Sequence, residues 1–241
     1  MKKVCIVQAR VGSSRLPGKV LQDLSGRTML ARVIERVRAA RSIDEVLVAT
    51  TTLIKDDPIV DECRRHSVSF WRGNETDVLD RYFQAAKSAE ADIVIRITSD
   101  CPLIDPDVTD QTIQAFLRVR PDYASNTIVR TFPRGLDTEV ISCNALERAW
   151  QEAQQPYERE HVTPYILEHS SEFQLHSVTG DRDYSSYRWT VDTPEDLAFA
   201  RAVYSRLCSE GVFSWHRVLE LLEREPELID LNSCVTQKSS H

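Results

Sequence analysis

A group of small and positively charged residues stands near the start of the chain, directly after a short apolar run. Its members are Arg10, Gly12, Ser13, Ser14, Arg15, Gly18 and Lys19. Glycines let a backbone approach a ligand closely, and serine hydroxyls and cationic side chains bind phosphate oxygens. The loop is not a Walker motif, because five residues separate its two glycines and Val20 stands where a serine or threonine would hold magnesium. We interpret it as a cradle for phosphate groups, with a basic surface turn as the alternative.

Two aspartates farther along the chain each end a strand-like segment. Asp100 follows the most strand-like run of the sequence, and Asp192 follows the run 188–191. In open α/β sheets, ligands bind at the carboxyl ends of the strands, and Mg²⁺ prefers one or two carboxylates together with substrate phosphates. Taken alone, each aspartate fits a turn equally well, which is the role we assign to Asp105 before Pro106.

The aspartates and the cationic loop together match the needs of phosphoryl transfer. In that chemistry a metal bridges the phosphates, and fixed cations neutralise the charge of the leaving group. We therefore predict that Asp100 and Asp192 bind Mg²⁺ as the cofactor, and that Arg15, Lys19 and Asp100 are catalytic. Positioning and electrostatics would supply most of the rate, because little covalent chemistry falls to the protein.

Three weaker pairs of polar or small residues complete the candidate site. They are Gly73 with Asp77, Arg134 with Asp137, and Glu160 with His161. The first pair follows a short strand, where a base or a ribose can approach the backbone. The other two pairs offer charged groups to a polar acceptor, with solvated surface as the alternative. A lone histidine in a charged helix is more often structural than catalytic.

Strand-like and helix-like segments alternate along the chain. Short apolar runs predict strands, and apolar stripes at helical spacing predict helices. The predicted strands are 3–9, 45–50, 69–72, 92–97, 137–142, 174–178 and 188–191. The predicted helices are 28–39, 58–66, 76–90, 106–119, 143–154, 157–169 and 214–225, together with one that begins at Pro194. We expect an interruption of the helix 157–169 near Pro164, and Thr193 as the N-cap of the helix that begins at Pro194. This alternation predicts βαβ units on a mostly parallel sheet in one α/β domain.

Composition excludes several classes of protein. The chain has 241 residues, and its formal net charge of −7 gives no support for nucleic-acid binding, which calls for a basic face. No run of about 18 apolar residues occurs, so we expect no membrane span. The apolar stretch after Met1 is too short for a signal peptide. The six cysteines form no CxxC or CxxH pair, so we expect buried, reduced thiols in a cytoplasmic protein.

The motifs resemble those of a known family over nearly the whole chain. The segments that carry the resemblance are 8–10, 16–19, 98–105, 135–140, 160–163 and 191–196. Together they resemble the spore-coat polysaccharide cytidylyltransferase-like family. That family is related to the cytidylyltransferases of acidic sugars, which activate acylneuraminate and ketodeoxyoctonate.

The resemblance implies a Rossmann-like three-layer α/β/α fold of the nucleotide-diphospho-sugar transferase type over residues 1–232, before a polar tail, 233–241, that we expect to fray. It implies transfer of CMP from CTP to a small acidic acceptor, release of pyrophosphate, and a homodimer. By similarity, the nucleotide would contact Ala9, Arg10, Gly12, Ser13, Ser14, Arg15, Lys19, Gly73 and Asp77. The acceptor would lie near Arg134, Asp137, Glu160 and His161.

Three alternatives stay open at this point. The first is a nucleotidyltransferase that uses another nucleoside triphosphate, or a phosphonate or phosphosugar acceptor. The second is a metal-dependent glycosyltransferase, because Asp181 and Asp183 have the spacing of a DxD pair in a polar loop. The third is a non-catalytic nucleotide-binding module, against which the intact set of charged candidates argues.

Overall fold

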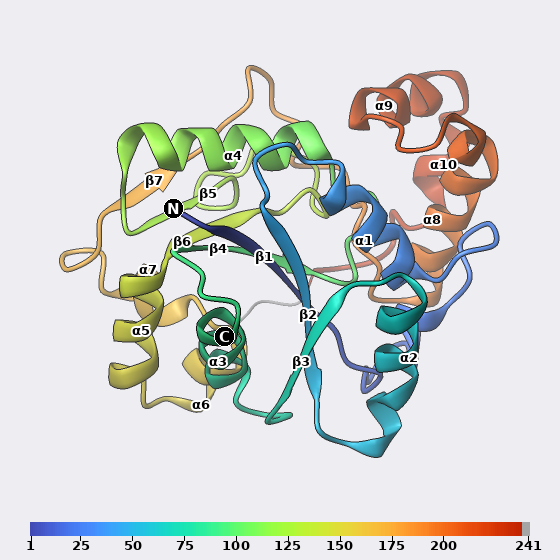
Figure 1. The fold of residues 1–241 in the computed structure, drawn as a ribbon. Helices are drawn as coiled ribbons and strands as arrows, with labels where there is room; N and C mark the ends of the chain where they lie inside the picture. Colours follow the sequence, from blue (N-terminus) through green and yellow to red (C-terminus); the bar gives the residue numbers. More distant parts are fainter. Residues whose placement is uncertain (238–241) are drawn as a thin grey trace.

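The computed structural model describes residues 1–237, and its central feature is a seven-stranded sheet in the order β3-β2-β1-β4-β6-β5-β7 (Figure 1). The strands are β1 (Lys3–Gln8), β2 (Glu45–Thr51), β3 (Ser69–Gly73), β4 (Ile93–Thr98), β5 (Tyr123–Ser125), β6 (Glu139–Ser142) and β7 (Leu175–Ser177). Pairing is parallel from β3 through β4 and between β5 and β7, whereas β6 is antiparallel to both of its neighbours. The predicted mostly parallel, mixed sheet is confirmed.

Helices cover both faces of this sheet and so make a three-layer fold. They are α1 (Met29–Arg38), α2 (Asp57–Arg65), α3 (Val78–Ser88), α4 (Pro106–Val119), α5 (Cys143–Glu152), α6 (Pro156–His161), α7 (Pro164–Glu168), α8 (Pro194–Leu207), α9 (Trp215–Arg224) and α10 (Glu227–Asp230). Single turns of 3-10 helix form η1 (Lys19–Leu21), η2 (Ile54–Asp56) and η3 (Cys208–Glu210).

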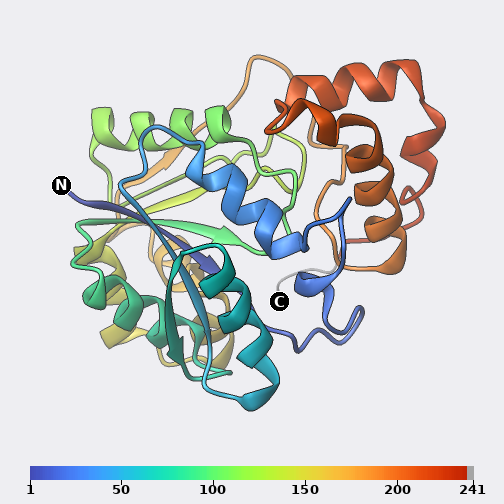
Figure 2. The ribbon, with the colours of Figure 1, turned by 45° about the vertical axis from the view of Figure 1, so that its right-hand side comes forward.

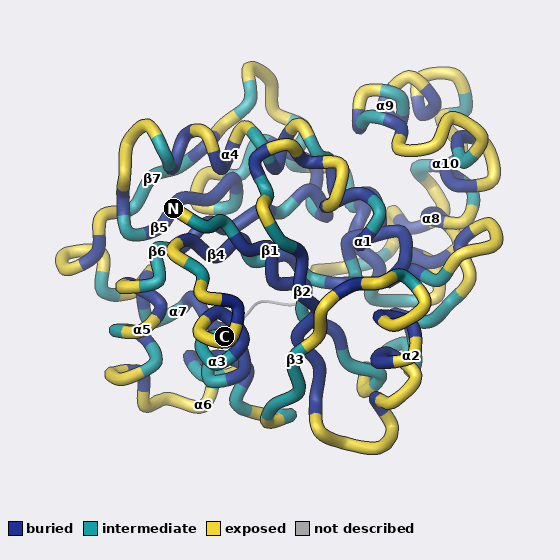
Figure 3. The backbone as a smooth tube through the Cα atoms, viewed as in Figure 1, coloured by how far each residue is buried: buried dark blue, intermediate teal, exposed yellow. Residues whose placement is uncertain are grey.

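Strand β1 shows how the sequence builds the layers. Its side chains alternate between the two faces, because successive residues of a strand point in opposite directions. Cys5 and Val7 pack with the helices α1, α2 and α4, whereas Val4 and Ile6 pack with α3 and α5. All four are fully buried, and the tube in Figure 3 is buried along the centre of the sheet. A strand whose four central positions are all apolar therefore lies between two helical layers.

The helices α8, α9 and α10 form a third packed group beside α1 (Figure 2). Their buried residues pack against apolar side chains of the loops that follow the strands, including Leu24, Leu136 and Trp189. Arg32 of α1 stacks its guanidinium over the ring of Tyr204, 4.8 Å from the centroid. This group closes the sheet at the end where the predicted site residues lie. The extent of the domain, 1–232, stays a prediction.

Two helices begin where their capping residues were predicted. Asp105 Oδ1 accepts hydrogen bonds from the backbone N–H of Asp107 (2.9 Å) and Val108 (3.1 Å) at the start of α4. Thr193 begins α8 with a capping box, in which its side chain and that of Asp196 accept from each other's backbone N–H. Such caps typically stabilise a protein by about 1 kcal/mol. They confirm that Asp105 is a helix cap.

The predicted strand 188–191 is wrong. Only Arg188 makes a β-bridge, to Arg134, and the segment then crosses the carboxyl end of β4, where Val191 N–H donates to Asp100 O at 2.8 Å. The same segment also passes close to the loop before β6, because a Cβ atom on Gly135 of that loop would lie 2.6 Å from the backbone nitrogen of Thr190. Apolar and β-branched residues are therefore buried here by the neighbouring loops and not by a sheet.

The interruption predicted near Pro164 is confirmed, because the segment 157–169 forms the two short helices α6 and α7. The strand β5 was missed, because three residues carry too little pattern. Asn232, just before the tail, donates to Arg188 O (2.9 Å) and Asp196 Oδ1 (3.0 Å), and the Gln237 side chain within the tail accepts from the Arg188 guanidinium. The expectation that the tail frays stays a prediction. The remaining tail residues, 238–241, lie outside the described part of the chain.

Candidate active site

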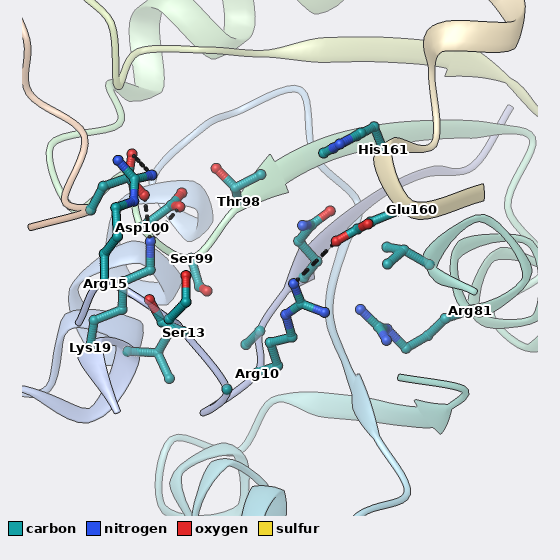
Figure 4. Close-up of a pocket in the computed structure, with 17 residues that line it drawn as sticks. Arg10, Ser13, Arg15, Lys19, Arg81, Thr98, Ser99, Asp100, Glu160 and His161 are labelled. Carbon is teal, nitrogen blue, oxygen red and sulfur yellow. Dashed lines mark hydrogen bonds and ion pairs between the residues drawn. The ribbon is translucent and has the colours of Figure 1, made fainter. Parts of the chain in front are cut away.

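A pocket at the carboxyl ends of β1 and β4 collects most of the predicted site residues (Figure 4). Its volume is about 320 Å³, at the lower end of the usual range for small-molecule sites. Its lining includes Gln8, Ala9, Arg10, Gly12, Ser13, Ser14, Arg15, Lys19, Val78, Arg81, Thr98, Ser99, Asp100, Glu160, His161 and Asp192. The predicted residues that do not line this pocket are Gly73, Asp77, Arg134 and Asp137.

The loop between β1 and η1 folds back on itself along one wall of the pocket. Gly18 N–H donates to Val11 O at 3.0 Å, and Gly18 adopts a left-handed conformation with φ +69°, which favours glycine. Ser13 Oγ accepts a hydrogen bond from the Leu16 N–H at 3.3 Å. The fold of the loop thus presents its hydroxyls, its backbone and Arg15 to one space, as a phosphate cradle requires.

A buried carboxylate outside the pocket holds this loop in place. Asp56 has no exposed surface, and its Oδ1 accepts the N–H of Val11 at 2.7 Å. Its other oxygen accepts a hydrogen bond from the hydroxyl group of Thr51 at the end of β2. The sequence analysis missed Asp56, because a single aspartate among the polar residues before α2 carries no recognisable spacing.

Lys19 lies between the two aspartates that were predicted to bind metal. Its ammonium group donates to Asp100 Oδ2 (2.8 Å), to Asp192 Oδ1 (2.9 Å) and to the backbone oxygen of Val191 (2.8 Å). These three bonds use all three donors of the ammonium. The structure therefore brings Lys19, Asp100 and Asp192 together, with Lys19 as the counter-ion of both carboxylates and not as a free phosphate ligand.

The charges of this cluster stabilise one another. Burial alone would lower the pKa of Lys19, but Asp100 and Asp192 outweigh it and raise that pKa above its usual value. Burial alone would raise the pKa of Asp100, but Lys19 outweighs it and lowers that pKa below its usual value. At neutral pH the pocket therefore holds an ammonium and an ionised Asp100 in direct contact.

Asp192 is more heavily neutralised than Asp100. Its Oδ2 accepts from Arg188 (3.0 Å) and forms an ion pair with Arg15 (3.1 Å), while its Oδ1 accepts from Lys19. Arg188 also donates two hydrogen bonds to the carboxylate of Asp196, each 2.9 Å long. Asp100 pairs with Lys19 through Oδ2, its Oδ1 accepts a weak hydrogen bond from the Cys101 thiol at 3.6 Å, and a hydrogen bond from Thr98 helps to lower its pKa.

The opposite end of the pocket is formed by α3, α6 and the start of the loop. Arg10 and Glu160 form a weak ion pair at 3.5 Å, and Figure 4 shows His161 above them, across the pocket from Lys19. Arg81, which the sequence analysis did not select, also lines this end. Glu160 and His161 thus lie with the nucleotide-binding candidates, in the same pocket.

Gly73 and Asp77 do not line the pocket, but they contact Arg81 and α3, which form part of its wall. A Cβ atom on Gly73 would lie 3.2 Å from Cγ of Arg81, so the glycine leaves room for that side chain. Asp77 caps α3 by accepting the N–H of Asp80 at 2.9 Å, and it forms an ion pair with Arg159 at 2.8 Å. The predicted contact of these two residues with a base or ribose stays a prediction, but their observed contacts are with Arg81 and α3.

Arg134 and Asp137 lie beside the Asp192 end of the pocket. Asp137 accepts two hydrogen bonds from Arg130, at 2.5 and 2.8 Å. Within residues 1–237, no side chain or backbone group bonds to the half-buried guanidinium of Arg134. Burial and the charge of Arg130 lower the pKa of Arg134, and it also feels the charge of Asp192. Arg134 is therefore a cation available to an anionic ligand, whereas Asp137 is already paired.

The donor set fits a hard divalent cation that is shared with substrate phosphates. Asp100 and Asp192 converge on one cation, the Lys19 ammonium, and Oδ1 of Asp100 accepts a weak hydrogen bond from the Cys101 thiol. In the described part of the chain, no group of three or more His, Cys, Asp or Glu side chains could hold a metal by itself. Magnesium commonly binds through one or two carboxylates and completes its shell with phosphate and water.

The comparison with protein families agrees with this geometry. The family model described as cytidylyltransferase matches residues 4–223, which include the whole pocket.

The chain belongs to the cytidylyltransferase family.

The relatives of this cytidylyltransferase include spore-coat proteins and acid-sugar enzymes. The spore coat polysaccharide biosynthesis protein SpsF of Bacillus subtilis is 32% identical over 229 residues, which are 92% of this chain and 94% of that protein. A 3-deoxy-manno-octulosonate cytidylyltransferase of Trichlorobacter lovleyi is 35% identical over 117 residues, 48% of this chain and 46% of that enzyme. The relationship inferred from the motifs is therefore confirmed.

A solved structure supports the fold of this cytidylyltransferase. A cytidylyltransferase from Leptospira borgpetersenii superposes with a TM-score of 0.92 at 35% identity, over 99% of this chain and 100% of that one. The three-layer nucleotidyltransferase fold is thus confirmed. Among the described residues, no helix is long and apolar enough to cross a membrane.

Two other expectations meet the structure here. The Asp181 and Asp183 pair does not reach the pocket: Asp181 lines a separate cavity with Phe132 and Trp215, and Asp183 accepts the N–H of Ser185 at 2.8 Å. All six cysteines are free, but only Cys5, Cys63 and Cys101 are buried. The expectation that the thiols are reduced stays a prediction, and the expectation that all are buried is wrong.

Proposed function

We propose that the protein transfers CMP from CTP to a hydroxyl group of an acidic sugar or a similar acid, releases pyrophosphate, and uses Mg²⁺. The observation that carries this proposal is the junction of the cationic loop 10–19 with Asp100 and Asp192 in one pocket. Two of the relatives, a spore-coat polysaccharide biosynthesis protein and a 3-deoxy-manno-octulosonate cytidylyltransferase, support a sugar acid as the acceptor.

In this reaction the acceptor oxygen attacks the α-phosphorus of CTP. A new P–O bond forms, the bond from the α-phosphorus to the bridging oxygen breaks, and pyrophosphate leaves with that electron pair. The hydroxyl proton passes to solvent or to a basic oxygen near the acceptor. Arg10, Arg15 and the loop's hydroxyls and N–H groups bind the triphosphate and hold it in line, so that positioning and electrostatics supply the rate.

Asp100 and Asp192 would hold the magnesium ion, with Asp100 as the stronger ligand because Arg15 and Arg188 already occupy Asp192. A bound ion would withdraw charge from the phosphates of the substrate. Lys19, which lies beside both carboxylates, would add a fixed positive charge at this end of the pocket.

Arg134 is the residue we propose for the acceptor's carboxylate, because its guanidinium is unpaired and lies near Asp192. We expect Arg134→Ala to raise KM for the acid by roughly tenfold or more, as a charge-assisted hydrogen bond contributes about 1.5–3 kcal/mol, and to leave KM for CTP unchanged. Steady-state kinetics with each substrate varied in turn measure this. Arg182→Ala, at an exposed arginine, is the control, and an equal change in both KM values would contradict the assignment.

The donor is tested by thermal unfolding with Mg²⁺ and each of CTP, UTP, ATP and GTP, repeated with chelator for CTP. A ligand at 100 times its Kd stabilises by about 2.7 kcal/mol, which moves the midpoint by roughly 5–11 °C for a chain of this length. A shift with CTP that is lost on chelation supports both the donor and the metal. A shift with another nucleotide would favour the alternative nucleotidyltransferase.

We also propose that the protein is a homodimer and is cytoplasmic. The unpaired state of all six cysteines fits a reducing compartment. Size-exclusion chromatography with light scattering tests the oligomeric state, and a monomer at micromolar concentration would contradict it.

A further inference from the structure

A buried carboxylate, that of Asp196 in the first turn of α8, holds Asp192 in two ways. Asp196 has no exposed surface, and its Oδ2 accepts the backbone N–H groups of Asp192 (2.9 Å) and Thr193 (3.1 Å). It also accepts two hydrogen bonds from the guanidinium of Arg188, whose Nη2 donates to Asp192 Oδ2 at 3.0 Å. Asp196 therefore fixes the backbone of Asp192 and also the cation that orients its side chain.

Asn232, near the end of the chain, adds a further partner to this cluster. It follows α10, which packs against α8 (Figure 1). Asn232 is 6% exposed, and its Nδ2 donates to Asp196 Oδ1 at 3.0 Å and to the backbone oxygen of Arg188 at 2.9 Å. These two bonds match the two hydrogens of its amide group. Asn232 therefore ties Arg188 and Asp196 together from a distant part of the sequence.

The cluster ends at the pocket, on a carboxylate that we propose as a metal ligand. Asp192 lines the pocket together with Lys19 and Arg15, which pair with its Oδ1 and Oδ2 respectively. Arg188, in contrast, is not part of that lining. It therefore holds Asp192 from outside the ligand space, where an incoming nucleotide does not compete for it. A partner in this place can orient a metal ligand before and after the substrate binds.

We propose that Asn232 is a positioning residue for the divalent cation. Through Asp196 and Arg188, it holds the carboxylate of Asp192 in the orientation that binds the ion. This inference rests on the proposed function and adds a residue from the end of the chain to the active site. Asn232 does not line the pocket, so its effect on the metal passes through Asp192. Loss of a partner that orients a metal ligand typically weakens metal binding or activity by about 10- to 100-fold.

Titration with Mn²⁺, without nucleotide and again with CTP, tests this proposal without relying on turnover. The relaxation rate of water protons reports the bound ion. We expect Asn232→Leu to raise Kd for Mn²⁺ by roughly tenfold, because leucine has a similar size and donates no hydrogen bond. Ser233→Ala, at the exposed neighbouring residue, is the matched control and should leave Kd unchanged. If Asn232→Leu does not fold, Asn232→Ser, which keeps one donor, is measured and should raise Kd by a smaller factor.

A double variant shows whether the effect passes through Asp192. In an Asp192→Asn background, Asn232→Leu should change Kd for Mn²⁺ by less than about twofold, because residues of one hydrogen-bond network are coupled and the positioned charge is gone. An equal loss in both backgrounds would show a general structural effect and overturn the proposal, as would unchanged Mn²⁺ binding by folded Asn232→Leu. Either result leaves the proposed function standing. A wild-type protein that binds no Mn²⁺, alone or with CTP, would contradict the proposed use of a metal itself.

Discussion

Asp100→Asn is expected to lower kcat by roughly 10³-fold while the protein stays folded. The change removes the less heavily neutralised of the two aspartate charges beside Lys19, which is the main ligand we propose for magnesium. A loss of 10³-fold corresponds to about 4 kcal/mol of transition-state stabilisation, at 1.36 kcal/mol per factor of ten. Pyrophosphate release with saturating CTP and acid measures it.

The fold should tolerate this variant, because the asparagine oxygen can still accept from Lys19, which also keeps its bonds to Asp192 and Val191. Circular dichroism and the unfolding midpoint check that point. Asp107→Asn is the matched control, since it makes the same chemical change at an exposed site in the first turn of α4. Full activity in a folded Asp100→Asn protein would remove Asp100 from the mechanism.

Lys19→Met is expected to have two effects of opposite sign. Turnover should fall by roughly 10²-fold or more, since one fixed charge for the developing pyrophosphate is lost. Binding of Mn²⁺ to the nucleotide-free protein should tighten by about tenfold or more. The ammonium that now neutralises Asp100 and Asp192 would be absent, and two like charges about 4 Å apart repel by about 4 kcal/mol near a protein surface.

Electron paramagnetic resonance of free Mn²⁺ measures the second effect independently of activity. Lys55→Met is the control, because Lys55 pairs with Glu75 at 2.6 Å, away from the two aspartates. Unchanged or weaker Mn²⁺ binding by Lys19→Met would mean that the aspartates do not share a cation position with the lysine. A loss of turnover together with tighter Mn²⁺ binding is expected only if the lysine competes with the metal ion for the two aspartates.

The sequence was sufficient for features that depend on local patterns. Asp105 and Thr193 were identified as helix caps because a cap, a proline and an acidic first turn occur at fixed spacing. The loop 10–19 and Asp100 were identified because polar groups directly after buried strands must lie at one edge of a parallel sheet. In each case the identifying pattern lies within a few residues, so it is visible in one sequence.

Other features depend on contacts between distant segments and could not be read in advance. Lys19 was predicted to bind phosphate, but it bonds to Asp100 and to residues 191–192, which are far from it in the sequence. These bonds make it the counter-ion of the two aspartates. Asp56 and Arg81 were missed, since each acts on the pocket from a helix or turn without a motif. The segment 188–191 has the composition of a strand, but loops and not a sheet bury it.

The central claim is that the α-phosphorus of CTP is the reacting atom. The most direct test is incubation of the protein, Mg²⁺ and a panel of sugar acids with CTP labelled in either the α- or the γ-phosphate, with Asp100→Asn as the inactive control. The account predicts that the α label enters an acid-bound product and that the γ label is recovered only in pyrophosphate. Recovery of the γ label as inorganic phosphate, or the same transfer from UTP and not from CTP, would contradict it.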